Sequence, residues 1–161
     1  MDFSKFKTPD WLVIGGGLAV LIGGLLDWFS VDGGGSGGNA FDFFFTGTVP
    51  WVLIVGAAVI TFLLAGGIMK TGGPPWTLIV LGLTALGALL LLVRLIMGAD
   101  ASDFGDIPDG VSDFSLDRAF GLYLTVLGGV VAAVGAFLGF QASGGNVRDL
   151  TDIEKMKSAF K

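Results

Sequence analysis

Four apolar segments of about twenty residues each dominate this sequence, and they restrict the possible folds more than any other feature. About 20 apolar residues of α-helix cross a membrane hydrocarbon core, which is about 30 Å thick. The stretches between the segments are rich in Gly, Pro, Ser and Asp, which are typical of turns and loops. The pattern predicts four transmembrane helices, over residues 11–31, 51–69, 76–98 and 119–141.

The composition agrees with this interpretation. The chain is 53% hydrophobic and only 14% charged, whereas soluble domains carry about a quarter charged residues. We therefore predict an all-α fold in which residues 1–145 form an integral membrane four-helix bundle. The first segment follows two lysines, as a signal peptide would, but it is long for one and no A-x-A-like cleavage site follows it. We expect it to be retained as a helix.

The distribution of positive charge predicts the orientation. Lysines and arginines outside the helices concentrate in the N-terminal segment, the second connection and the tail. By the positive-inside rule both termini are expected in the cytoplasm, with the connections 32–50 and 99–118 outside the plasma membrane. Aromatic residues at both ends of the helices are expected to anchor them at the membrane interfaces; they are Trp11, Trp28, Trp51, Trp76, Phe43, Phe44 and Phe45.

Residues 146–161 have the pattern of a short amphipathic helix. Thr151 and Glu154 have the spacing of a capping box, and apolar residues recur on one face of the predicted helix. The lysines among them suit an anionic membrane surface. We predict a cytoplasmic helix that lies on the membrane; binding to a soluble partner is the alternative.

Small residues recur along the fourth segment at the spacing that lets two helices approach closely. One interpretation is packing within the bundle, and the other is pairing with a second copy or another subunit. The predicted packing interface consists of Gly121, Thr125, Gly129, Ala132 and Ala136.

Two charged residues lie near the ends of apolar segments. Asp27 and Arg94 stand about 25 Å along their helices from the inner interface, and so near the outer one. They are candidates for an ion pair, with Arg118 as a competing partner, and Arg94 could also extend its guanidinium to the headgroups. The alternative is that they line a solute path at its outer mouth. No ionisable residue falls at the middle of a predicted helix, which counts against ion or proton pumping.

The chemistry available to the chain is narrow. With no cysteine and no histidine, disulfides, thiolate catalysis and the usual zinc and haem sites are excluded. The net charge of −5 and the lack of a basic stripe argue against nucleic acid, and we expect no cofactor and no enzymatic activity. A solvated acidic loop is the favoured interpretation of residues 99–118, since an EF-hand pattern is absent; the weak calcium candidates there are Asp100, Asp103, Asp106 and Asp109.

Short motifs add a resemblance. A first segment that ends in "LLDWFSV", a Gly/Ser loop leading to "NAFD", then "LVRLI" and "DRAFGLYL" resemble four-helix membrane proteins of high-GC Gram-positive bacteria that have no assigned activity. In those proteins a proline often precedes the tryptophan that Asp27 precedes here. The resemblance implies a bacterial plasma membrane and no particular activity.

Two functions agree with these features. The first is a non-enzymatic membrane protein that acts by association, as a scaffold or accessory subunit, with lipid, other membrane subunits or further copies as partners. The second is an oligomeric channel or small-solute pore, in which Asp27 and Arg94 stand at an acidic outer mouth.

Overall fold

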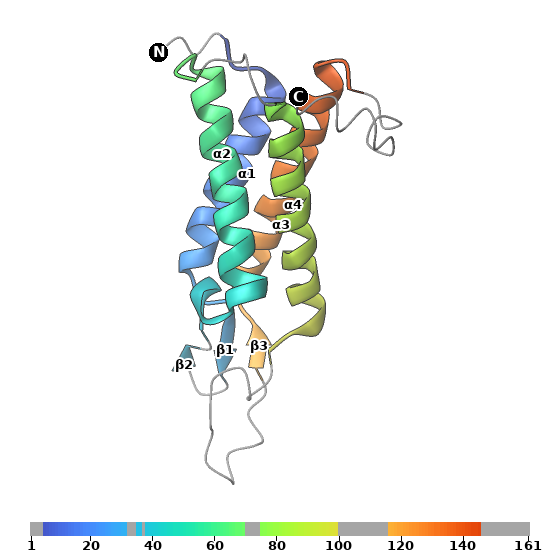
Figure 1. The fold of residues 1–161 in the computed structure, drawn as a ribbon. Coiled ribbons are helices and arrows are strands. Elements are labelled where there is room, and N and C mark those ends of the chain that lie inside the picture. Colours follow the sequence, from blue (N-terminus) through green and yellow to red (C-terminus); the bar gives the residue numbers. More distant parts are fainter. Residues whose placement is uncertain (1–4, 32–34, 37, 70–74, 100–115, 146–161) are drawn as a thin grey trace.

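Four long helices run side by side and alternate in direction in the computed structural model (Figure 1), which describes residues 5–31, 35–36, 38–69, 75–99 and 116–145. All four are long and apolar enough to cross a membrane. The predicted all-α bundle of four helices, each able to span a membrane by its length and composition, is therefore confirmed. The helices are α1 (Thr8–Leu25), α2 (Val49–Ala65), α3 (Trp76–Met97) and α4 (Phe120–Ala142).

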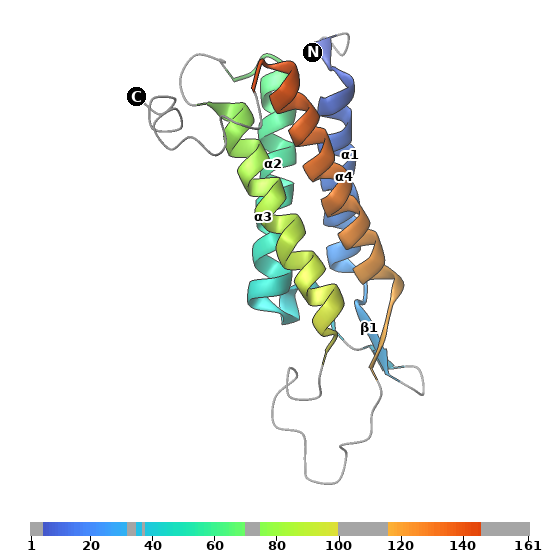
Figure 2. The ribbon, with the colours of Figure 1, turned by 90° about the vertical axis from the view of Figure 1, so that its right-hand side faces the viewer.

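The helices form a closed ring in which each packs against two neighbours. α1 contacts α2 and α4, and α3 contacts the same two helices. The most extensive contact joins α1 to α4, the first and last helices of the chain (Figure 2). Because α1 and α4 are adjacent, the ring closes although they are far apart in sequence.

Glycines make the close contact between α1 and α4. A Cβ added at Gly16 would lie 2.5 Å from the carbonyl oxygen of Gly128, and one added at Gly128 would lie 2.7 Å from the carbonyl oxygen of Gly16. Real Cβ atoms do not approach backbone this closely, so any side chain here would push the helices apart. Small residues allow this packing in membranes, where burial of apolar surface does not itself drive helices together.

The first helix is shorter than predicted, because α1 ends at Leu25 and not at residue 31. After Leu26 the backbone is extended, and the Trp28 side chain turns into the bundle, where its Nε1 donates to the Gly23 carbonyl at 3.0 Å. The apolar side chains of Trp28 and Phe29 are thus explained by burial at the end of the bundle. Periodicity alone does not distinguish such a strand from a further turn of helix.

A small antiparallel sheet closes this end of the bundle, which we call the sheet end. It contains β1 (Phe29–Val31), β2 (Gly35–Ser36) and β3 (Leu116–Arg118), in the order β2-β1-β3. In the central strand, Ser30 pairs with Ser36 on one side and Asp117 on the other. The sheet was not predicted; it joins the chain after α1 to the chain before α4.

The core has two unlike halves. Toward the sheet end it contains large side chains, among them Trp28, Phe29 and Phe43, and Ile54 and Leu91 fill its middle. Toward the other end the core cluster consists of smaller residues, which are Val13, Ala57, Ala58, Val80 and Ala136. The bundle is therefore well filled at the sheet end and has less side-chain volume at the opposite end.

Candidate functional site

Arg94 is the one charged side chain that the bundle buries among the described residues, with 5% of its surface exposed. It lies in the last turn of α3. Its guanidinium carbon is 3.6 Å from the centre of the Phe43 ring and 5.2 Å from the centre of the Phe29 ring. A planar cation over aromatic faces gains about 2 kcal/mol when it is shielded from water. The sequence predicted how far along its helix Arg94 lies, but not that aromatic rings would cover its guanidinium.

Phe29 and Phe43 cover Arg94 and Trp28 packs behind Phe43, and we call these three side chains the aromatic cap. The rings of Trp28 and Phe43 are stacked with centroids 6.1 Å apart, and Phe29 meets Phe43 edge to face at 5.5 Å. The backbone at Trp28 is held on both sides, since its N–H donates to Gly38 and its carbonyl accepts from Ala119, each at 2.8 Å. Trp28 and Phe43 are buried. Both were predicted to anchor the bundle at a membrane interface, and the structure places their side chains inside the bundle.

Arg118 completes the end of α3. Its Nε donates to the Leu95 carbonyl at 3.0 Å and its guanidinium reaches the Ile96 carbonyl at 3.5 Å. These are carbonyls of the last helical turn, which have no partner within the helix and attract positive charge. Asp27 is exposed, just beyond the end of α1. The ion pair between Asp27 and Arg94 stays a prediction.

The five small residues singled out on α4 are all buried within the bundle. Thr125 donates its hydroxyl to the Gly121 carbonyl at 2.7 Å, so its polar group is satisfied inside its own helix. A Cβ added at Gly129 would approach Leu91 and Ile54. Substitutions at these positions would disturb the bundle itself. The exposed face of α4 carries Phe120, Tyr123, Leu127, Val130, Val134 and Leu138.

The other predicted anchors remain nearer the surface. Trp11 is half exposed, and Phe44 and Phe45 are among the more exposed aromatic residues of the described chain. Trp51 is partly buried, and its Nε1 donates to the Leu21 carbonyl at 3.4 Å. Trp76 is also partly buried. The calcium candidates Asp100, Asp103, Asp106 and Asp109 and the predicted amphipathic helix over 146–161 lie outside the described residues.

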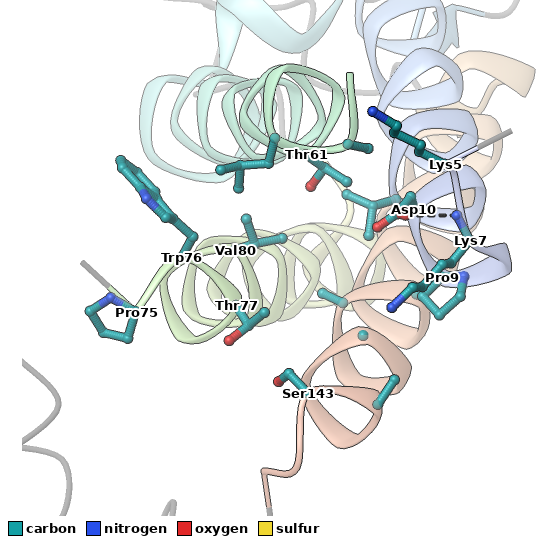
Figure 3. Close-up of a pocket in the computed structure, with 17 residues that line it drawn as sticks. Lys5, Lys7, Pro9, Asp10, Thr61, Pro75, Trp76, Thr77, Val80 and Ser143 are labelled. Atoms are coloured by element: carbon teal, nitrogen blue, oxygen red, sulfur yellow. Dashed lines mark hydrogen bonds between the residues drawn. The ribbon is translucent and has the colours of Figure 1, made fainter. Parts of the chain in front are cut away.

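A pocket of about 680 Å³ opens at the end of the bundle opposite the sheet, which we call the pocket end. Residues from all four helices line it. Its apolar wall includes Val13, Val80 and Ala136, which belong to the core cluster of smaller side chains. Figure 3 shows Lys5, Lys7 and Asp10 on one side of the pocket and Pro75 and Trp76 across from them. Its volume is within the range of small-molecule sites, about 300–1,000 Å³.

The segment that carries the two lysines is held against the bundle. Phe6, between them, is buried, and its ring lies 5.3 Å from that of Trp11 and 5.8 Å from that of Phe62. The backbone N–H of Lys7 donates to the Asp10 carboxylate at 2.8 Å, which caps the start of α1. Lys5 and Lys7 are therefore placed at the pocket by contacts on both sides.

These features define a class: a multi-pass membrane-type four-helix bundle that is capped at one end by aromatic rings over an arginine and hollow at the other. Comparison with protein-family models, with curated proteins and with solved structures found no match to the chain. The function is therefore argued from the chain's own geometry.

Sequence reasoning missed the pocket and the aromatic cap. The sequence contains one signal for the cap. Aromatic residues at positions 28, 29 and 43 lie between the first and second helices, and Arg94 lies near the end of the third helix, on the same side of the bundle. No local pattern marks the pocket, because it results from small residues on four helices that meet only in the folded bundle.

Proposed function

We propose that this protein is non-enzymatic and acts by association, as a scaffold or accessory subunit of a membrane complex. The observation that supports this is an exposed aromatic pair at the sheet end. Phe44 and Phe45 are 63% and 75% exposed, and their rings meet edge to face at 5.2 Å. Exposed aromatic side chains on a rigid frame suit a protein interface, because they supply contact area with little loss of side-chain entropy.

Hydrogen bonds and burial hold the backbone beneath the aromatic pair. The pair begins a five-residue π-helical turn, Phe44–Thr48, directly before α2. Phe43, the preceding residue, is buried in the aromatic cap, and its carbonyl accepts from the N–H groups of Gly47 and Thr48 at 2.6 and 3.0 Å. The hydroxyl of Thr48 also donates to the Ala40 carbonyl at 3.3 Å. The pair is thus presented by a fixed backbone.

The proposal includes an orientation and a location. Both termini lie in the cytoplasm, and the sheet end with its aromatic pair faces outward from a bacterial plasma membrane. The positive charge of Lys5 and Lys7 at the pocket end supports this orientation. The partner is then another membrane protein, or a second copy, that reaches the outer end of the bundle.

The alternative of an oligomeric pore has less support. Ile54 and Leu91 are fully buried in the middle of the bundle, and Arg94 is covered by the aromatic cap instead of standing at a mouth. A path would have to run between copies of the chain. Conductance of reconstituted bilayers that changes with Asp27→Asn would favour this alternative, whereas silent bilayers at high protein content would dismiss it.

The experiment is to purify the protein from its native membrane in a mild detergent, measure the mass of the complex and identify the chains at fixed ratio. We expect the complex to be lost in the variant Phe44→Ser/Phe45→Ser, because its aromatic contact is removed. The matched control is Phe120→Ser, which alters an equally exposed aromatic residue on α4. A monomer in the unaltered protein, or a complex that survives the double substitution, would contradict the proposal.

A further inference from the structure

The pocket end combines three features: a cavity, fixed positive charge and an apolar wall. We propose that the pocket binds the headgroup of an anionic phospholipid from the membrane leaflet at that end. The site is formed by Lys5 and Lys7 at the mouth and by Val13, Val80 and Ala136 deeper inside. It is distinct from the aromatic pair at the sheet end, so it stands or falls independently of the proposed association.

The charge at the mouth selects an anion. Lys5, Lys7 and Asp10 are the charged side chains among the described lining residues, which leaves an excess of one positive charge. The Asp10 carboxylate already accepts the backbone N–H of Lys7, whereas both lysines are exposed at the mouth. Two helices start and two end here, so the effects of their dipoles on an anion largely offset one another. The lysines therefore dominate the attraction for a phosphate group.

The depth of the pocket favours a lipid over a fully buried ligand. Thr61 lies one turn before the end of α2, and Ala136 lies six residues before the end of α4. The pocket thus reaches about 6 to 9 Å into the bundle, which is short of the middle of a hydrocarbon core about 30 Å thick. This is the level of the headgroup and the first methylenes of a lipid. Lys5 and Lys7 lie at the mouth, and Val13, Val80 and Ala136 lie deeper, in the same order as the charged and apolar parts of a phospholipid.

The test measures lipid binding to the purified full-length protein in a zwitterionic detergent by native mass spectrometry. The probes are phosphatidylglycerol, phosphatidylcholine with the same acyl chains, and inorganic phosphate. We expect saturable binding of one phosphatidylglycerol, and binding of phosphatidylcholine about tenfold weaker. The double variant Lys5→Gln/Lys7→Gln should weaken phosphatidylglycerol about tenfold and remove the preference, since two exposed charge contacts together supply a factor of this order.

A second pair of variants tests the cavity without altering charge. A Cβ added at Gly139 would meet only Pro9, at 3.6 Å, so Gly139→Phe can fill the mouth from α4 without a clash at its base. Gly82→Phe is the matched control, because a Cβ there meets nothing within 4 Å on an exposed position of α3. Gly139→Phe should abolish the bound lipid, and Gly82→Phe should leave it unchanged.

Three outcomes would overturn the proposal. The first is equal binding of the two lipids, and the second is phosphatidylglycerol binding that persists in both Lys5→Gln/Lys7→Gln and Gly139→Phe. The third is inorganic phosphate that binds as tightly as phosphatidylglycerol, which would assign the pocket to a soluble anion. None of these outcomes affects the complex that depends on Phe44 and Phe45, so failure here is distinguishable from failure of the proposed association.

Discussion

Arg94 occupies a position where an arginine is stable only if its charge and its planar face are both accommodated. A charged side chain within the span of a membrane helix is unfavourable by about 2.5–3.5 kcal/mol on insertion scales. The aromatic cap offsets much of this, because two ring faces lie against a guanidinium that is shielded from water. Lysine would supply the charge without the flat surface that stacks on Phe43.

A double-mutant cycle on Arg94 and Phe43 measures this contact. Arg94→Met keeps most of the bulk and removes the charge, while Phe43→Leu removes the ring. We expect each to lower the melting temperature in detergent, with a coupling between them of about 1–2 kcal/mol. The control pair is Arg118→Met with Phe43→Leu, which should be additive because Arg118 bonds to carbonyls of α3. Additivity in the Arg94 cycle would show that the rings contribute volume only.

At the scale of elements, the contact between α1 and α4 depends on glycines such as Gly16. The neighbouring position on α1, Gly15, has room for a side chain. Gly15 and Gly16 are neighbours on α1, but a Cβ at Gly15 meets nothing within 4 Å, whereas one at Gly16 meets the backbone of α4. The two positions form a matched pair, identical in chemistry and opposite in surroundings. The same substitution made at each position therefore tests the packing of the Gly16 face, because only the surroundings of the added side chain differ.

Gly16→Leu should destabilise the bundle by several kcal/mol, because the added side chain must push two backbones apart. Gly15→Leu should be neutral or slightly stabilising, since leucine is the better helix former. Thermal unfolding of the two variants in the same detergent checks this, with a shift of at least several degrees expected for Gly16→Leu alone. Equal shifts for both variants would mean that α1 does not pack through the Gly16 face.

The sheet gives a second test at this scale. The chain has no native cysteine, so an introduced pair of cysteines has no competing thiol within the chain. Ser30 lies opposite Asp117 in the antiparallel pair of β1 and β3, and opposed residues are within disulfide reach. The variant Ser30→Cys/Asp117→Cys should therefore form an intramolecular disulfide under mild oxidation, visible as faster migration in non-reducing gels. The two single-cysteine variants are the controls. A double variant that stays reduced would contradict the register.

At the scale of the whole molecule, the proposed orientation places the sheet end and the pocket end on opposite sides of the membrane. Ser30→Cys and Ser143→Cys introduce one thiol at each end, both at exposed positions. A membrane-impermeant maleimide should label Ser30→Cys in intact cells, and should label Ser143→Cys only after the membrane is permeabilised. The reverse pattern would invert the orientation, and labelling of both in intact cells would contradict the four spans.

The helices could be predicted from the sequence because each is long, continuous and bounded by turn residues. The end of α1 could not, since the apolar residues 26–31 satisfy a helix and a buried strand equally well. The position of Arg94 along α3 was predictable from the rise per residue, but the direction of its side chain was not. That direction depends on Phe43, which the chain brings back from a loop beyond another helix. The pocket depends in the same way on how four helices meet.

The close contact of α1 with α4 has a consequence for biosynthesis. During translation α1 enters the membrane long before α4 is made, so its glycine face at first has only lipid or the insertion machinery against it. The pairing of β1 with β3 cannot form either until residues 116–118 have been made. Arrival of the fourth span therefore completes two structures in one step, and a nascent chain halted before residue 116 retains neither.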